Sequence, residues 1–208
     1  MQQFWQFALI TLTSLLFIVD PIAAVPSYLV VTQDETSEQR KHTALRASVA
    51  MALMLVVFAA AGRFIFQAFG ITLPAFRIAG GLILWLVALD MLRAQRSTQE
   101  GHDELAEGQA KDDVAITPLA IPILAGPGAI STVMVLAGEV QTVSHGIVVY
   151  GSIVITAAVA YVTLRLGERL VQIMGQTGIK VMTRIMGLLL AAVATQFILT
   201  GVKDAFFT

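Results

Sequence analysis

The sequence contains no cysteine, few histidines and few charged residues. The absence of cysteine excludes disulfides, cysteine-ligated zinc, iron–sulfur clusters and a thiol nucleophile. The three histidines, at positions 42, 102 and 145, do not have the spacing of metal ligands. Charged residues make up 13% of the chain, whereas soluble domains carry about 25%. No cofactor is implied, and the shortage of charge is not typical of a soluble domain.

Hydrophobic residues, in contrast, are abundant. They make up 57% of the 208 residues, and the mean hydropathy is +0.80. The 13 Lys and Arg residues nearly balance the 14 Asp and Glu residues, so the net charge of −1 indicates no nucleic-acid partner. The apolar N-terminal stretch lacks a preceding positive charge, and we expect it to be a retained first span rather than a signal peptide. The composition predicts an all-α integral membrane protein whose surroundings are a lipid bilayer.

The chain divides into six apolar segments long enough to cross a bilayer, each needing about 20 residues. The expected transmembrane helices are residues 4–30, 44–69, 75–94, 114–137, 145–168 and 181–203. Between the third and fourth lies a polar stretch, residues 97–113, with six acids and no apolar period, which predicts a linker. We therefore expect a first three-helix repeat over 1–96 and a second over 114–208.

Two of the expected spans contain residues that interrupt helices. Asp20, Pro21, Ile22 and Pro26 lie in the first span, and Gly126, Pro127 and Gly128 lie in the fourth. A proline inside a helix costs about 3 kcal/mol, and glycine loosens the turn further. Non-helical backbone is tolerated at membrane depth only where protein or a watery cavity satisfies its polar groups. The breaks predict a binding site; the alternative is that they only kink or pack the helices.

The spacing of the breaks indicates an internal repeat. Pro21 precedes Arg77 by 56 residues, and Pro127 precedes Arg184 by 57, with Arg-Ile-x-Gly at both arginines. Because each half has an odd number of spans, the two copies lie upside down relative to one another. Inverted repeats with interrupted helices at matching places are typical of transporters whose site lies near the bilayer midplane.

Asp20 is the one acid well inside an expected span. An ionised aspartate at mid-bilayer costs at least about 2.5 kcal/mol, so such residues usually face a cavity or a partner. Asp20 could hold a coupling proton or sodium ion, accept a substrate ammonium, or cap the half-helix that begins at Pro21. These roles are compatible with one another.

The other polar residues suggest structural roles. We expect Arg77 and Arg184 to extend to the membrane interface, with Glu139 also interfacial. Gly81 and Gly187 provide small helix faces for close packing. No nucleophile elbow, Walker loop, HExxH helix or paired-carboxylate site is present in the sequence. We therefore predict that the protein is a transporter and not an enzyme. The alternative is a membrane-embedded non-transporter, either an enzyme or an assembly factor.

Four motifs in order resemble the MarC family of inner-membrane proteins over nearly the whole chain. The matching residues are Asp20-Pro21-Ile22 with Pro26, Phe76 to Gly81, Pro118 to Pro122 leading into Ala125 to Gly128, and Thr183 to Leu188 with Gln196-Phe197-Ile198 and Gly201. The resemblance implies six spans in two inverted halves. It also implies secondary transport of small neutral, zwitterionic amino acids such as glycine and alanine across the inner membrane.

The distribution of positive charge predicts the orientation of the chain. With the N-terminus outside, ten Lys and Arg residues lie near inner span ends and three near outer ones. Both termini should then lie on the outer, periplasmic side. Single cysteines introduced at Gln2 and at Thr208 of this cysteine-free chain should both react with an impermeant thiol reagent applied outside intact cells. Labelling of the two from opposite sides would contradict the odd-span, inverted-repeat arrangement.

Overall fold

The computed structural model describes residues 2–93, 115–140 and 142–206, and within these ranges every regular element is a helix. The predicted linker, residues 97–113, lies outside the described residues. The helices are α1 (Gln2–Val19), α2 (Pro21–Val31), α3 (Ser37–Phe69), α4 (Leu73–Arg93), the π-helix η1 (Ala115–Leu124), α6 (Pro127–Gly138), α7 (Val143–Arg165) and α8 (Gly167–Phe206).

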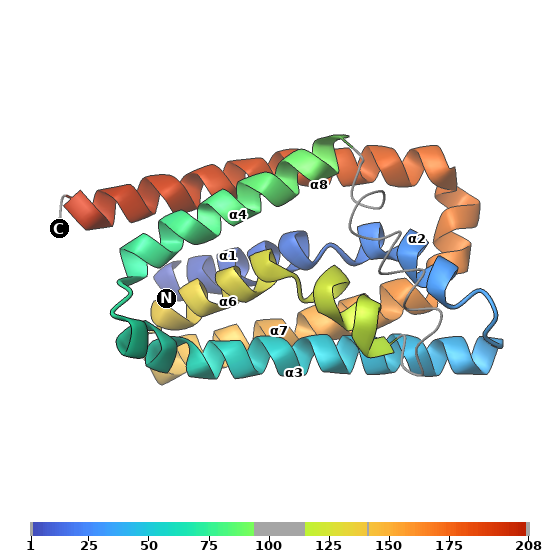
Figure 1. Ribbon diagram of the computed structural model, residues 1–208, viewed down its shortest axis with the longest axis horizontal. Coiled ribbons are helices and arrows are strands. Elements are labelled where there is room, and N and C mark those ends of the chain that lie inside the picture. The colour runs from blue at the N-terminus through green and yellow to red at the C-terminus, as the bar shows by residue number, and fades with distance from the viewer. Residues whose placement is uncertain (1, 94–114, 141, 207–208) are drawn as a thin grey trace.

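The helices run lengthwise in an elongated bundle (Figure 1). Helices α1 and α3 both pack against α6 and α7, and their buried apolar residues form the main core. Helices α4 and α8 form an antiparallel pair along one side of this core. Helix α1 begins and α8 ends at the same end of the bundle, as expected for a chain with an even number of crossings (Figure 1).

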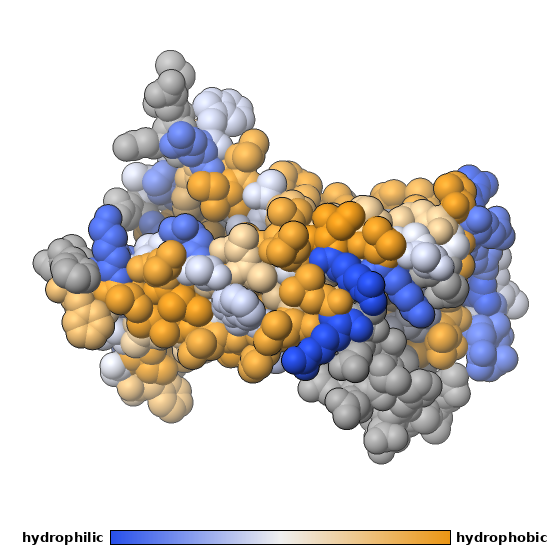
Figure 2. All heavy atoms as spheres, turned by 90° about the horizontal axis from the view of Figure 1, so that it is seen from above, coloured by the Kyte–Doolittle hydropathy of each residue, from blue (hydrophilic) through white to orange (hydrophobic). Residues whose placement is uncertain are grey.

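Five segments of the described chain are long and apolar enough to cross a membrane. They are Phe4–Val31, Ser37–Gly62, Leu73–Arg93, Val143–Arg165 and Thr177–Phe206. The fourth expected span, 114–137, is not one long helix, because its residues divide between η1 and the shorter apolar helix α6. The face seen in Figure 2 is mainly hydrophobic along its middle, with hydrophilic residues toward both ends and in one cluster between.

Local sequence signals set several helix ends. Thr36 and Gln39 form a capping box at the start of α3, each side chain bonding to the other's backbone N–H. Gly70 ends α3 with a left-handed φ of 63°, which glycine adopts without steric cost. Gly175, also at φ 63°, redirects the chain within α8. The first part of α8 therefore crosses the end of the bundle before the helix turns along it (Figure 1).

Glycines allow the close approach of α4 and α8, which confirms the packing role predicted for Gly81 and Gly187. A Cβ on Gly81 would lie 2.9 Å from the Ala194 carbonyl oxygen, and one on Gly187 would lie 3.1 Å from the Ala88 carbonyl oxygen. These contacts are with backbone, which cannot move aside as a side-chain end can. Small residues at such contacts let membrane helices gain van der Waals energy where lipid supplies no hydrophobic driving force.

A charged cluster joins three elements at the end of the bundle that carries the termini. Arg77 of α4 is 8% exposed and makes ion pairs with Glu139, the C-cap residue of α6, and with Asp204 of α8. The prediction that Arg77 merely extends to the interface is wrong, because its side chain bridges two acids supplied by the other half of the chain. Arg184, at the matching position of the second half, is exposed.

Replacing Arg77 should destabilise the protein, whereas replacing Arg184 should not. Arg77→Gln leaves two partly buried carboxylates without their cation, which should cost about 1–3 kcal/mol. Arg184→Gln removes an exposed arginine and should change stability by less than about 0.5 kcal/mol. Reversible unfolding of both variants in detergent measures the difference. Equal stability of the two variants would show that the cluster does not hold the three elements together.

Candidate functional site

The first interruption lies between α1 and α2. Helix α1 ends at Val19, and α2 begins at Pro21. Asp20, between them, is 3% exposed and has a left-handed φ of 40°, the one positive φ among the described non-glycine residues. Its carboxylate oxygen Oδ1 accepts a hydrogen bond from the Ala23 backbone N–H at 3.3 Å. The carboxylate therefore caps α2 as its sequence position predicts, and its negative charge faces the positive end of the helix dipole.

Pro26 extends the disturbance one turn into α2. It lies inside the helix and has no N–H, so the carbonyl of Ile22 lacks its intrahelical donor. Ile22 and Pro26 are both half-buried, whereas Pro21 is buried. The start of α2 thus combines the buried carboxylate of Asp20 with the carbonyl oxygen of Ile22, which lacks its usual hydrogen bond within the helix.

The second interruption lies between η1 and α6. η1 spans Ala115–Leu124 and contains two prolines four residues apart, at positions 118 and 122, neither of which can donate a backbone hydrogen bond. It ends with a bond from the Ala125 N–H to the Ala120 carbonyl, 2.8 Å long and five residues back. Gly126 is extended, and Pro127 is the first helical residue of α6. No described side chain caps this helix start, unlike that of α2.

The fold brings the two interruptions together. Helix α1 packs against α6, and α2 packs against η1. Gly128, in the first turn of α6, lies against Ile18, two residues before Asp20: a Cβ there would be 3.0 Å from Ile18 Cδ1 and 3.2 Å from Leu84 Cδ2 of α4. Two helix starts separated by about half the chain therefore share one region of the core.

The individual site residues are not equally enclosed. Pro21 and Gly128 are buried, Gly126 is half-buried and Pro127 is exposed. In this conformation the side chains of Ile18 and Leu84 occupy the space beside Gly128. Here Gly128 makes a helix contact, and a ligand could reach it only if those side chains moved.

Buried hydroxyl groups form a feature that our reading of the sequence missed. Thr11 of α1, Thr132 of α6 and Thr156 of α7 are each at most 1% exposed, and none of their hydroxyls has a hydrogen-bond partner among the described residues. Buried hydroxyls without partners cost free energy unless water or a ligand satisfies them. The signal was present in the spacing, since Thr11–Ser14 and Ser152–Thr156 each place two hydroxyls on one helix face.

The arrangement does not resemble a metal centre. Within the described residues, no group of three or more histidines and acids lies close enough to hold a metal ion. The polar groups at the interruptions are one carboxylate, released carbonyls and uncapped amides. Such groups can form hydrogen bonds with a small polar solute.

A bundle with five long apolar helices, a divided fourth segment and an apolar core defines a multi-pass integral membrane protein. The profile of the MarC family of integral membrane proteins matches residues 5–206, so the chain belongs to this family, which confirms the resemblance in the sequence.

Relatives of similar length occur in archaea and bacteria. The chain is 34% identical to a UPF0056 membrane protein of Methanocaldococcus jannaschii, covering 96% of this chain and 98% of the relative. It is 34% identical to UPF0056 membrane protein YhcE of Escherichia coli (91% and 88%) and 36% identical to UPF0056 membrane protein YvbG of Bacillus subtilis (93% and 92%). No solved structure matches the chain.

The geometry of Asp20 predicts different effects of two substitutions. Asp20→Asn should keep nearly full stability, because asparagine also caps helices and tolerates the left-handed conformation. Asp20→Ala loses the cap and strains the backbone, which should cost about 2–3 kcal/mol. Unfolding of the purified variants in detergent tests this difference. A stable Asp20→Ala protein would mean that the carboxylate is not needed as a cap.

Proposed function

We propose that this protein is a secondary carrier that moves small neutral amino acids, such as glycine and alanine, across the inner membrane. The observation that carries the proposal is the meeting of two interrupted helices in the core, where Gly128 of α6 lies against Ile18 of α1. Interrupted helices expose backbone groups that can coordinate a substrate at membrane depth, and nearby protein makes the interruption tolerable.

The two interruptions differ in charge in a way that suits a zwitterion. Asp20 occupies the positive end of α2 with its own carboxylate, so that end is not available to an anion and can instead attract an ammonium group. The start of α6 has no side-chain cap, so its amide groups remain suited to a substrate carboxylate. The glycines and the short side chains around both starts favour a small amino acid over a bulky one.

An inverted repeat is supported by the contacts of the helices. Exchanging the halves pairs α1 with η1, α2 with α6, α3 with α7 and α4 with α8. The exchange turns the contact of α3 with α6 into that of α7 with α2, and both contacts occur. It likewise relates the α1–α7 contact to the α3–η1 contact, and the α4–α6 contact to the α2–α8 contact. All four of these contacts are also present. Helices α3 and α7 run in opposite directions, as do α4 and α8 (Figure 1).

Such a repeat offers a route to alternating access, because the halves can exchange conformations around a shared site. The present conformation differs between the two ends. Arg77 is held by Glu139 and Asp204 at the end that carries the termini, whereas its counterpart Arg184 is exposed and makes no ion pair with a described residue. This difference is expected of a carrier that is closed at one end.

Uptake by the purified protein in liposomes tests the proposal. Labelled glycine, alanine, serine, glutamate and a cationic drug should be offered with and without imposed proton or sodium gradients. We expect uptake of glycine or alanine to exceed that of glutamate, since the sequence has no Lys or Arg within about ten residues of either break that could bind a second carboxylate. No amino-acid uptake by folded protein under any gradient would favour a non-transporter, and uptake of the drug alone would contradict the zwitterion argument.

Matched variants connect the uptake to the site. Gly128→Ala places one methyl group between α6 and the side chains of Ile18 and Leu84, and should lower glycine uptake about ten-fold or more. Gly151→Ala, in α7, meets nothing within 4 Å and serves as the control. Asp20→Asn tests coupling: full activity with an unchanged pH and cation dependence would leave Asp20 with its capping role alone.

A further inference from the structure

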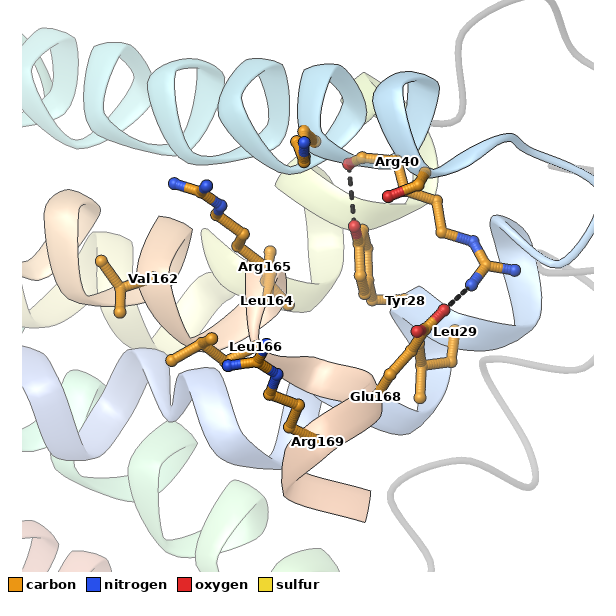
Figure 3. Close-up of a pocket in the computed structure, with 11 residues that line it drawn as sticks. Tyr28, Leu29, Arg40, Val162, Leu164, Arg165, Leu166, Glu168 and Arg169 are labelled. Atoms are coloured by element: carbon orange, nitrogen blue, oxygen red, sulfur yellow. Dashed lines mark hydrogen bonds and ion pairs between the residues drawn. The ribbon is translucent and has the colours of Figure 1, made fainter. Parts of the chain in front are cut away.

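The end of α2, the start of α3 and the turn between α7 and α8 lie at the end of the bundle opposite the termini (Figure 1), and their residues line a cavity of about 340 Å³ that includes none of the predicted site residues. Among the described residues that line it, four are basic and one, Glu168, is acidic (Figure 3). The basic residues are Arg40, Lys41, Arg165 and Arg169.

The turn between α7 and α8 builds this cavity. Helix α7 ends at Arg165, and α8 begins at Gly167. A Cβ on Gly167 would lie 3.1 Å from Cγ1 of Val25, so the missing side chain lets the turn rest on α2. Arg165 and Arg169 flank this turn and therefore reach the same cavity as the first turns of α3.

The positive charge of the cavity is only partly neutralised. Arg40 pairs with Glu168, and its Nε donates to the Thr32 carbonyl at 2.8 Å. The Tyr28 hydroxyl donates to the Arg40 carbonyl at 2.8 Å, which fixes this side of the cavity (Figure 3). Arg165 and Arg169 form no ion pair with a described residue, and Glu38, whose carboxylate Arg165 also influences, is paired with Lys41.

Leu29, Val162, Leu164 and Leu166 form the apolar part of the lining, and this part continues onto the outer surface of α7. Val162 lines the cavity and is 50% exposed, and Ile155 and Val159 extend the same exposed helix face away from it. The candidate span Val143–Arg165 ends at the cavity, and the span Ser37–Gly62 begins there. The cavity therefore lies where a membrane surface would meet the protein, with charge at one side and an apolar stripe leading into the bilayer.

We propose that this cavity binds the anionic headgroup of a phospholipid, whose phosphate contacts Arg165 and Arg169 and whose acyl chains lie along Ile155, Val159 and Val162. Guanidinium groups match phosphate oxygens in two-point hydrogen bonds, and basic pockets at helix ends on the cytoplasmic side suit acidic lipids. Free phosphate can bind the same arginines, but it cannot make contact with the apolar side chains of Ile155, Val159 and Val162. The inference does not depend on transport.

Lipid titration of the full-length protein in detergent tests this site. Short-chain phosphatidylglycerol, phosphatidylcholine and inorganic phosphate should each be added and binding followed by native mass spectrometry and thermal shift. Phosphatidylglycerol should bind in preference to phosphatidylcholine. The double variant Arg165→Gln, Arg169→Gln should weaken its binding by roughly ten- to thirty-fold, since each lost cation near a membrane surface weakens attraction.

A matched control separates local binding from general charge loss. Arg93→Gln combined with Arg184→Gln removes two exposed arginines that do not line the cavity and should leave binding unchanged. Arg165→Lys with Arg169→Lys keeps the charge and should retain most of the binding, which excludes misfolding as the cause of a loss. Equal binding of both lipids, equal loss in the control pair, or full competition by inorganic phosphate at millimolar concentration would each overturn the proposal.

Discussion

Two helices of this protein are interrupted inside an otherwise apolar bundle, and a bilayer offers no water for the backbone groups that such interruptions expose. The fold answers this constraint by placing the interruptions next to each other and by capping one of them internally. Asp20 caps the start of α2, and Gly128 at the start of α6 packs against Ile18. Asp20 and Gly128 are both buried in this region.

Helices α4 and α8, on the outside of the bundle, are fixed to the core by close packing and by ion pairs. Helices α4 and α8 approach closely at Gly81 and Gly187 and form a long pair beside the core. Arg77 then connects this pair to the end of α6 through Glu139 and Asp204. The carrier mechanism proposed above requires such bodies to stay intact while they move relative to one another, and a charged cluster can release and re-form without disturbing the apolar packing.

Much of the fold could be predicted from composition and spacing because membrane helices carry a strong local signal. Span length, the Pro and Gly breaks and the cap at Asp20 depend on neighbouring residues in the chain. The span over 114–137 was expected to be interrupted at Gly126, Pro127 and Gly128, and α6 does begin at Pro127, but the π-helix η1 over the segment with prolines at 118 and 122 was not predicted. The role of Arg77 was not predictable, because its partners lie 62 and 127 residues away.

The sequence by itself determined that the chain is a helical membrane protein of the MarC family, where its helices break and which glycines pack, because these properties depend on composition and short-range spacing. Tertiary structure alone decided that the side chains of Ile18 and Leu84 occupy the space beside Gly128. It also decided that Arg77 bridges two distant acids. Only the folded chain brings Arg165 and Arg169 to the same cavity as Arg40. These contacts join residues far apart in the chain, and helical periodicity shows which face a residue occupies but not which helix covers that face.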